Sequence, residues 1–341
     1  MAKVTLKDIA HEVGVSPTTV SLVLNNRSCR VSDEKRRQIK ETARRKHYIP
    51  NQIARSLVMQ HSETFGLVVP NIESRYFSSI AKNIELLCRK HGYVLLITNS
   101  EGSAESDAEL VRLLVNRGVD GVFLIVSDEF ATQKDLVDVL SQLPVPYVMV
   151  DRFIEGLDCD RVRFDNELGG YLATNYLLEH GHRRIACIIN PNSNTGRARL
   201  AGYKRALLKR GIAPDPALVF ESDYYIPDAW RAAEGLLATD ATAAFASSDN
   251  IALGLLKRAY EHGLRVPDDL SVVSYDNSAA DSLFEPALTS IEQNVPSISE
   301  AAVKLMLARI EEQDAGGEAI PAVERVLVPH LVEQASVRTL S

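Results

Sequence analysis

The chain has 341 residues, of which 45% are hydrophobic, and its formal net charge at pH 7 is −7. This length suits two or three domains, and the composition is typical of a globular protein with full cores. The opening residues MAKVTLKDIA contain no apolar run of signal-peptide length, and no stretch is long enough to span a membrane, so we expect a cytoplasmic protein with no membrane partner.

The charge is unevenly distributed along the chain. Residues 1–60 contain 12 basic and 5 acidic side chains, a net +7, whereas the remainder contains 26 basic and 40 acidic ones, a net −14. This asymmetry indicates a basic segment that binds a polyanion and a separate acidic body. The four cysteines are far apart without a CxxC pair, so we expect reduced thiols and neither a metal site nor a cofactor: Cys29, Cys88, Cys159 and Cys187.

Residues 5–25, TLKDIAHEVGVSPTTVSLVLN, predict two short helices joined by a tight turn. In the first, Leu6, Ile9 and Val13 recur at helical spacing and form one apolar face. Gly14 interrupts this helix. Two amphipathic helices with such a turn are a helix-turn-helix, whose second helix can lie in the major groove of DNA.

Start signals mark the second and third helices of this segment. Ser16 is suited to the N-cap of the second helix and Pro17 to its first turn. Ser32 is expected to cap a third helix over residues 33–46, which completes a headpiece of residues 1–49. The basic residues in and around that helix can reach DNA phosphates, which position a protein without reading sequence: Lys35, Arg36, Arg37, Arg44, Arg45 and Lys46.

Residues 50–61 are expected to be a linker with a short helix at 52–58, capped by Asn51. An isolated helix of this length is marginal in water, so it should fold only when something packs against it. Its Ile53, Ala54 and Leu57 lie on one side, and a projecting leucine can wedge into a minor-groove base step. A plain interdomain linker is the alternative.

From Thr64 onward, strands and helices alternate, which predicts βαβ units and parallel sheets covered by helices on both faces. The first series contains strands at 65–69, 94–98, 122–126 and 147–150, with helices at 77–90, 105–116 and 136–143. The second series begins near Arg163 and contains strands at 185–189, 217–220, 243–246 and 270–274, with helices at 167–179, 198–210, 228–237 and 250–262.

Late elements are expected to tie the two series together. A strand at 289–293, a helix at 299–311 and a strand at 326–331 are placed to cross back between two similar lobes and form a hinge. We therefore expect an α/β core over residues 62–341, with a first lobe of about 62–162 plus 293–323 and a second lobe of about 163–292 plus 324–341.

At this point the chain resembles the lac repressor/purine repressor (LacI/GalR) family of bacterial transcription regulators. The resemblance is carried, in the family's order, by TLKDIAHEVGVSPTTVSLVLN, HYIPNQIARSL, HGHRRIACI, NTGRARLAGY, SSDNIALG and VPDDLSVVSYDN. It extends from residue 4 to about residue 332. It implies a homodimer whose headpieces bind the halves of a pseudo-palindromic operator.

The resemblance also implies residues that contact DNA. Thr18 and Thr19 occupy the base-reading part of the second helix, and Leu57 is the expected minor-groove wedge. Pro17 and Leu22 depart from relatives, which often carry longer polar readers there, so the operator sequence cannot be carried over. The implied DNA-binding residues are Thr5, Leu6, Ser16, Pro17, Thr18, Thr19, Ser21, Leu22, Asn25, Arg30, Ser32, Tyr48, Asn51, Ala54 and Leu57.

The body resembles periplasmic sugar-binding proteins, which hold a ligand between two lobes. Open α/β sheets bind ligands beyond the carboxyl ends of their strands, and polar and aromatic residues occur there in this sequence. Carboxylates and guanidinium groups bond to hydroxyls, while aromatic faces pack on a sugar ring. The candidate effector-binding residues are Asn71, Tyr76, Phe77, Asp151, Arg152, Thr195, Arg199, Tyr224, Ser248, Asp249 and Asp276.

Several of these residues have an alternative role. Asp249 could N-cap the helix that begins there. Tyr76 and Phe77 could be ordinary lobe packing, and Arg199 and Asp276 could pair with one another across the cleft.

The combined expectation is a sequence-specific DNA-binding regulator, and more specifically a repressor, whose operator affinity depends on a small-molecule effector such as a sugar. Whether the effector releases or promotes DNA binding is not readable from the residues. The alternatives are a cytoplasmic sugar-acting enzyme, for which no catalytic motif is recognised, and a regulator that needs a protein co-effector. The C-terminal ASVRTLS lacks leucine heptads, so we expect a dimer and not a tetramer.

Overall fold

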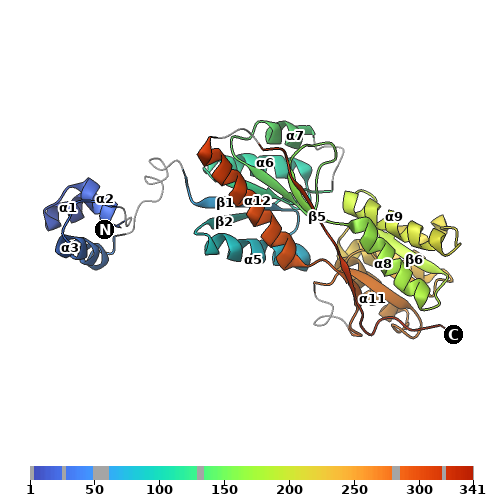
Figure 1. The fold of residues 1–341 in the computed structure, drawn as a ribbon. Helices are drawn as coiled ribbons and strands as arrows, with labels where there is room; N and C mark the ends of the chain where they lie inside the picture. Colours follow the sequence, from blue (N-terminus) through green and yellow to red (C-terminus); the bar gives the residue numbers. More distant parts are fainter. Residues whose placement is uncertain are drawn as a thin grey trace. The chain divides into compact units, whose positions relative to one another are not determined.

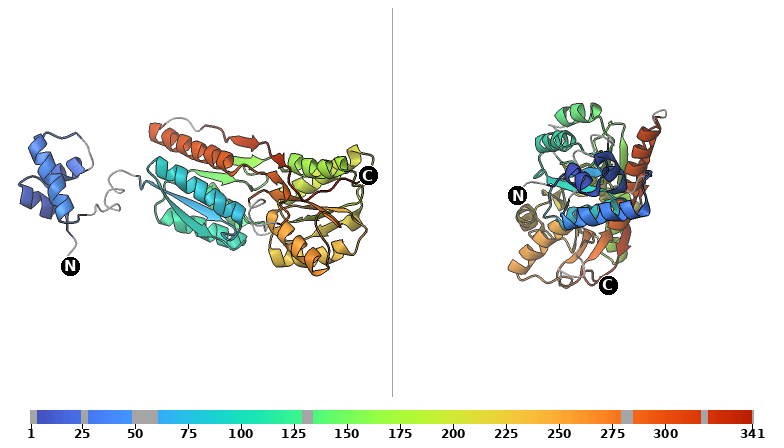
Figure 2. Two further views of the ribbon diagram at one scale, coloured as in Figure 1. Left: turned by 90° about the horizontal axis from the view of Figure 1, so that it is seen from below. Right: turned by 90° about the vertical axis from the view of Figure 1, so that its left-hand side faces the viewer.

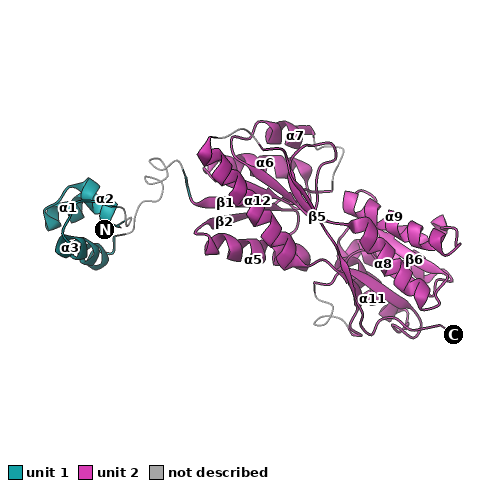
Figure 3. Ribbon diagram, in the orientation of Figure 1, with its two compact units in different colours: residues 1–62 teal, residues 63–341 magenta. Residues whose placement is uncertain are grey.

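The computed structural model describes residues 4–24, 28–48, 61–128, 134–278, 285–316 and 320–340. The chain divides into two compact units, Met1–Ser62 and Glu63–Ser341 (Figure 3). The helix expected at 52–58 lies outside the described residues, as do four of the implied DNA contacts: Asn25, Asn51, Ala54 and Leu57.

The described residues of the first unit form three short helices around a small core: α1 (Leu6–Val13), α2 (Pro17–Leu24) and α3 (Asp33–Arg45). Ile9, Val20 and Ile39, one from each helix, are fully buried against one another in this core. α1 ends at Gly14, which adopts a left-handed conformation with φ of +72° that glycine tolerates without strain. The expected helix-turn-helix and third helix are confirmed.

The second unit has two lobes, each with a six-stranded sheet between helices (Figures 1 and 2). The first lobe comprises β1 (Thr64–Val69), α5 (Arg75–Lys90), β2 (Val94–Asn99), α6 (Ala104–Asn116), β3 (Gly121–Leu124), α7 (Lys134–Ser141), β4 (Tyr147–Val150), β5 (Asp160–Phe164), α12 (Val295–Ala315) and β11 (Glu324–Leu327). Its strands are all parallel in the order β11-β5-β4-β3-β1-β2. Leu67 packs towards α5 and α12 while its neighbour Val68 packs towards α6 and α7, because successive side chains of a strand point to opposite faces.

The second lobe repeats this arrangement with its own sheet. It comprises α8 (Asn166–Glu179), β6 (Ile185–Ile189), α9 (Asn194–Lys209), a 3₁₀ turn (Pro216–Leu218), β7 (Val219–Glu221), α10 (Ile226–Leu237), β8 (Ala243–Ala246), α11 (Asp249–Glu261), β9 (Ser271–Asp276), β10 (Thr289–Glu292) and β12 (His330–Val332). The strand order is β12-β10-β9-β8-β6-β7, and only β12 is antiparallel to its neighbour among the described strands. α8 and α9 cover one face and α10 and α11 the other. The expected doubly wound α/β lobes are confirmed.

Three segments connect the lobes: between β5 and α8, between β10 and α12, and between β11 and β12. The first and third are hydrogen-bonded to each other, since the Asp165 amide donates to the Leu327 carbonyl at 2.9 Å. Asn294 caps α12 in the second crossing by accepting from the Ser297 amide at 2.9 Å. The late elements therefore cross between the lobes as expected.

The structure corrects three details of the expected elements. The last strand is two strands, because the chain leaves the first sheet after Leu327 and Pro329 has no amide to extend a ladder. Residues 324–327 consequently belong to the sheet of the first lobe and not to the second lobe. β5 was not expected; its alternation of half-buried arginines with buried apolar residues is that of a strand. Ala217 and Leu218 lie in the 3₁₀ turn, so the strand expected at 217–220 begins at Val219.

Among the described helices, none combines the length and apolar character that crossing a membrane requires.

α8 and α9 pack closely because glycines lie where they meet. A Cβ atom on Gly170 would collide with the backbone carbonyl of Arg199, and one on Gly202 would collide with that of Glu167. This close approach sets the position of α9, which carries Arg199.

We predict that Gly202→Ala destabilises the core by about 1–3 kcal/mol, because the added methyl group meets rigid backbone, including the Tyr171 nitrogen at 2.5 Å. Gly235→Ala is the matched control: its Cβ meets only the half-buried Phe220 ring, at 2.9 Å, which can shift. Denaturant unfolding of both variants measures the difference. Equal losses would contradict the packing argument.

Candidate effector cleft and DNA-binding surface

A cavity of about 810 Å³ lies between the two lobes of the core. Its wall includes every residue that the sequence predicts for effector binding: Asn71, Tyr76, Phe77, Asp151, Arg152, Thr195, Arg199, Tyr224, Ser248, Asp249 and Asp276. The first five come from the first lobe and the other six from the second. The rule that ligands bind beyond the carboxyl ends of parallel strands (the strand-end rule) thus predicted residues between positions 71 and 276 that surround one cavity.

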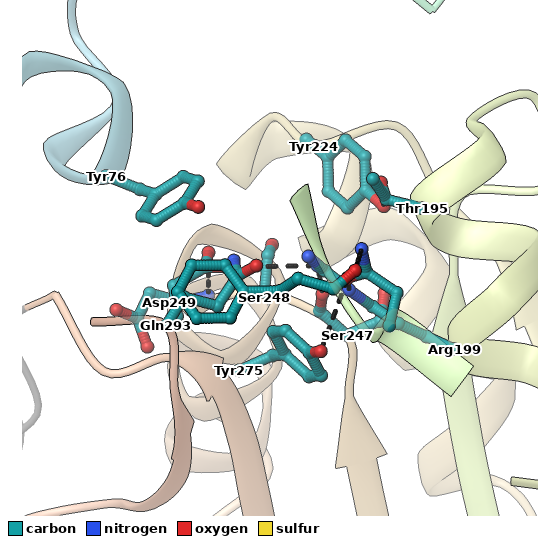
Figure 4. A network of polar contacts seen from close by, with 12 residues as sticks. Tyr76, Thr195, Arg199, Tyr224, Ser247, Ser248, Asp249, Tyr275 and Gln293 are labelled. Atoms are coloured by element: carbon teal, nitrogen blue, oxygen red, sulfur yellow. Dashed lines mark hydrogen bonds and ion pairs between the residues drawn. The ribbon is translucent and has the colours of Figure 1, made fainter. Parts of the chain in front are cut away.

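Arg199 is the most buried cation of this wall, with 3% of its surface exposed. Its Nε donates to Asn166 Oδ1 at 2.8 Å and its Nη1 to the Ser247 carbonyl at 2.6 Å. The guanidinium lies over the ring of Tyr275, 3.7 Å from the ring centre (Figure 4). Its nearest carboxylate oxygen is Asp276 Oδ1 at 3.8 Å. Arg199 and Asp276 do associate, but both belong to the second lobe, so the pair does not cross the cleft as the sequence reading allowed.

Asp276 ends β9 in a conformation that side chains rarely adopt, with φ of +91°. It accepts a hydrogen bond from Gln293 Nε2 at 2.9 Å, which links it to the second crossing between the lobes. Burial, opposed by Arg199 and assisted by Asp249 and Asp151, raises the pKa of Asp276 to about 7. A strained, buried carboxylate facing a cavity is typical of a functional site.

Asp151 occupies the corresponding place in the first lobe, directly after β4. Its φ is +65°, and it accepts a hydrogen bond from the Tyr76 hydroxyl at 2.9 Å. Burial raises the pKa of Asp151, and Arg199 and Arg152 oppose this shift. Burial, reinforced by the charge of Asp151, raises the pKa of Tyr76 well above its usual value. Tyr76 is therefore both lobe packing and a wall of the cavity.

Asp249 is not the cap of α11. Ser248 is the N-cap, accepting from the Ile251 amide at 3.2 Å. The carboxylate of Asp249 instead accepts from the Ser274 hydroxyl at 2.8 Å and from the amide and hydroxyl of Ser278 at 2.8 and 2.7 Å. These bonds hold the Asp249 side chain against the end of β9.

The remaining predicted residues lie on opposite walls. Thr195, at the start of α9, is 3.4 Å from the Tyr224 hydroxyl through its Oγ1. Arg152 of the first lobe lies between two rings, with its guanidinium carbon 4.9 Å from the centre of Phe77 and 5.3 Å from that of Tyr224. Tyr224 belongs to the second lobe, so this stack spans the cleft.

The sequence reading missed several residues of the wall. Glu101 follows β2, Asp128 follows β3, Asn190 follows β6 and Asp223 follows β7. The same strand-end rule, applied to every strand, would have found them. Tyr225, Asn250 and Ser278 also line the cavity, beside residues that were predicted.

In the headpiece, three of the predicted DNA contacts are also helix caps. Thr5 caps α1 through a reciprocal pair of bonds with Asp8, Ser16 caps α2 by accepting from the Thr19 amide at 3.1 Å, and Ser32 caps α3 by accepting from the Lys35 amide at 3.3 Å. The Thr5 hydroxyl also donates to Asp8 Oδ2 at 2.8 Å, so its single proton is directed at Asp8 within the headpiece.

The exposure of the other predicted DNA contacts divides them into two groups. Pro17, Thr18 and Arg30 are exposed, whereas half-buried side chains occur at Leu6, Thr19, Ser21, Leu22 and Tyr48. Leu6 and Tyr48 pack against the headpiece core. Pro17 and Thr18, both on α2, therefore form the exposed start of the second helix.

Four of the six cations that were expected to bind phosphates contact other residues of the headpiece. Arg45 and Lys46 pair with Glu12 of α1, Lys35 donates to the Val13 carbonyl at 2.7 Å, and Arg36 lies 3.7 Å from the Cys29 sulfur. These contacts tie α3 to the helix-turn-helix. Arg37 and Arg44, the other two, are exposed on α3.

Because burial raises the pKa of Asp276, we expect the free energy of unfolding to depend on pH. Its pKa is about 7 in the folded protein against its usual 3.8, so the folded state holds a proton that the unfolded state releases. This contribution to stability is fully present below pH 4 and is lost as the pH rises towards 7, with a slope of up to about 1.4 kcal/mol per pH unit. Asp276→Asn keeps the acceptor for Gln293 and should flatten this dependence in unfolding measurements between pH 4.5 and 7.5. An unchanged pH profile would contradict the assignment.

Known proteins resemble this chain over both units. Residues 5–51 match the model of bacterial regulatory proteins of the lacI family, and residues 174–337 match that of a periplasmic binding protein-like domain. The HTH-type transcriptional repressor PurR of Edwardsiella ictaluri (strain 93-146) is 35% identical over 338 residues, covering 98% of this chain and 96% of the relative.

Solved structures agree with these matches. The lac repressor dimer bound to operator and the anti-inducer ONPF has a TM-score of 0.85 at 27% identity and covers 99% of this chain and 100% of its own. The complex of the transcriptional regulator CelR with cellobiose has a TM-score of 0.72 at 30% identity and covers 98% of this chain and 100% of its own.

These relatives are transcription regulators and not enzymes, as expected, and the two solved regulators are bound to small molecules, ONPF and cellobiose. Among the residues that the structure describes, no group of three or more His, Cys, Asp or Glu side chains is placed to hold a metal ion. Given the identity and the coverage of the repressor relative, the chain belongs to the lacI family of bacterial transcription regulators.

Proposed function

We propose that this protein is a cytoplasmic repressor whose dimer binds a pseudo-palindromic operator and whose affinity for that operator changes when a sugar binds between the lobes. The observation that carries the proposal is the cavity wall, where buried carboxylates and guanidiniums alternate with aromatic rings contributed by both lobes. Charged groups of this kind bond strongly to hydroxyls, and rings such as Tyr76 and Tyr224 offer faces to the apolar side of a sugar. The cellobiose complex of a similar regulator supports the same ligand class.

The proposed coupling depends on which lobe each wall residue belongs to. A ligand that contacts Asp151 in the first lobe and Arg199 in the second would favour one relative position of the lobes. Each of the three crossings, including the one that carries Gln293, would move with that change. The ligand shifts operator affinity only as far as it prefers one state, commonly about 1–3 kcal/mol or 5–150-fold.

The role of the cleft can be tested with ligands. A thermal-shift screen of small sugars, sugar phosphates and purines identifies a stabilising ligand. Arg199→Lys keeps the charge but cannot reproduce the bonds to Asn166 and Ser247, so ligand affinity should fall at least about tenfold. The matched control is Arg205→Lys on the same helix, an exposed arginine paired with Glu167, which should leave affinity unchanged. Equal affinities in both variants would remove the ligand from this cleft.

The role of the headpiece can be tested with DNA. Thr18→Ala removes an exposed hydroxyl near the start of α2 and should weaken specific operator binding by about 1–3 kcal/mol, with little effect on unrelated duplexes. Arg44→Ala removes an exposed cation and should weaken binding to all duplexes and lower the salt dependence by about one charge. Fluorescence anisotropy at several salt concentrations separates the two patterns. Loss of specificity in Arg44→Ala alone would contradict the proposed reading helix.

A further inference from the structure

Arg152 is buried at the cleft but is already paired within its own lobe. Its guanidinium lies 2.9 Å from Asp128 Oδ2, and the side chains of Arg152 and Asp128 are 7% and 21% exposed. Nη1 also lies 3.5 Å from the Val126 carbonyl. Rings of Phe77 and Tyr224 lie near the guanidinium at 4.9 and 5.3 Å. Both polar contacts of the guanidinium are made by Nη1, which is therefore directed at Asp128 and the Val126 carbonyl.

Asp128 is itself held from the other lobe. The Asn190 side-chain amide lies 3.5 Å from Asp128 Oδ2, and both residues line the cavity. A ligand that displaced Asp128 from Arg152 would leave a half-buried carboxylate without its cation, which is costly.

The wall as a whole is acidic. Among the described residues of the wall, the carboxylates are Glu101, Asp128, Asp151, Asp223, Asp249 and Asp276, and the guanidiniums are Arg75, Arg152 and Arg199. Arg199 donates to Asn166 and the Ser247 carbonyl and has its nearest carboxylate, Asp276, at 3.8 Å, whereas Arg75 is exposed at the start of α5. Of the two buried cations described in this wall, Arg152 is thus the one with a carboxylate within hydrogen-bond distance.

We propose that Asp128 sets the charge specificity of the cleft: by holding Arg152 in an ion pair, it withholds that guanidinium from phosphate or carboxylate groups, so that the cleft accepts uncharged ligands and rejects their phosphorylated forms. This inference rests on the proposed role of the cleft in effector binding. It assigns to Asp128 a specificity-determining role that needs no contact with the uncharged ligand.

Inorganic phosphate is a probe that does not depend on the identity of the effector. We compare its binding to the full-length parent, Asp128→Asn, Arg152→Gln and the double variant by isothermal titration calorimetry. Asp128→Asn should bind phosphate at least about tenfold more tightly than the parent, because a charge-assisted bond to Arg152 becomes available. The double variant should lose this gain. Asp158→Asn is the matched control, since it removes the same charge from an exposed site of the same lobe outside the cleft wall.

The parent alone supplies a test that does not require Asp128→Asn to fold. Parent and Arg152→Gln should bind phosphate equally weakly, because Asp128 already pairs with the Arg152 guanidinium. Phosphate binding by the parent that is lost in Arg152→Gln would overturn the proposal, as would a folded Asp128→Asn protein that gains nothing. Neither result bears on whether an uncharged ligand changes operator affinity, which is the separate test of the proposed function.

Discussion

Arg199 joins parts of the second lobe that are distant in the chain. Its guanidinium contacts Asn166 at the start of α8, Ser247 after β8, and Tyr275 and Asp276 at the end of β9. Burying a guanidinium costs free energy unless hydrogen-bond acceptors are near, and Asn166 and the Ser247 carbonyl supply acceptors to Nε and Nη1. The half of the cleft that belongs to the second lobe is therefore organised around one side chain, and α9 must lie close to α8 for that side chain to reach.

The same contacts connect the cleft to the segments that join the lobes. Asp276 faces the cavity and also accepts a hydrogen bond from Gln293, which lies between β10 and α12. α12 packs on the first lobe, where Ile298, Val303 and Met306 enter its core. Asp276 is thus hydrogen-bonded to the segment that leads into α12, the helix that packs on the first lobe. In the first lobe, Asp151 and Tyr76 offer a second polar contact to the same cavity.

Sequence reasoning predicted the three-helix headpiece and both lobes because each element carries a local signal. Ser16, Ser32 and Gly14 mark helix ends, and the apolar strand runs mark the parallel sheets. The strand-end rule also predicted part of the cavity wall, including Asp151 and Asp276. Residues at the carboxyl ends of parallel strands gather at one edge of the sheet whatever their distance in the chain.

What the sequence did not predict depends on tertiary contacts. The division of the last strand between two sheets requires knowing that β11 pairs with β5 and β12 with β10. The engagement of Arg45 and Lys46 by Glu12, and of Arg152 by Asp128, joins residues more than 20 positions apart that have no shared periodicity. An arginine that is free to bind an anion and one that is already paired look identical in sequence.

The proposed regulation requires a coupling free energy between ligand binding in the cleft and operator binding by the headpiece. The most direct test measures the affinity of the stabilising ligand for the full chain with and without saturating operator DNA. Since coupling between two binding sites is reciprocal, the ligand's affinity must change by the same factor by which the ligand changes operator affinity. We expect equal factors that both differ from one; a ligand affinity unaffected by operator would contradict the proposed coupling.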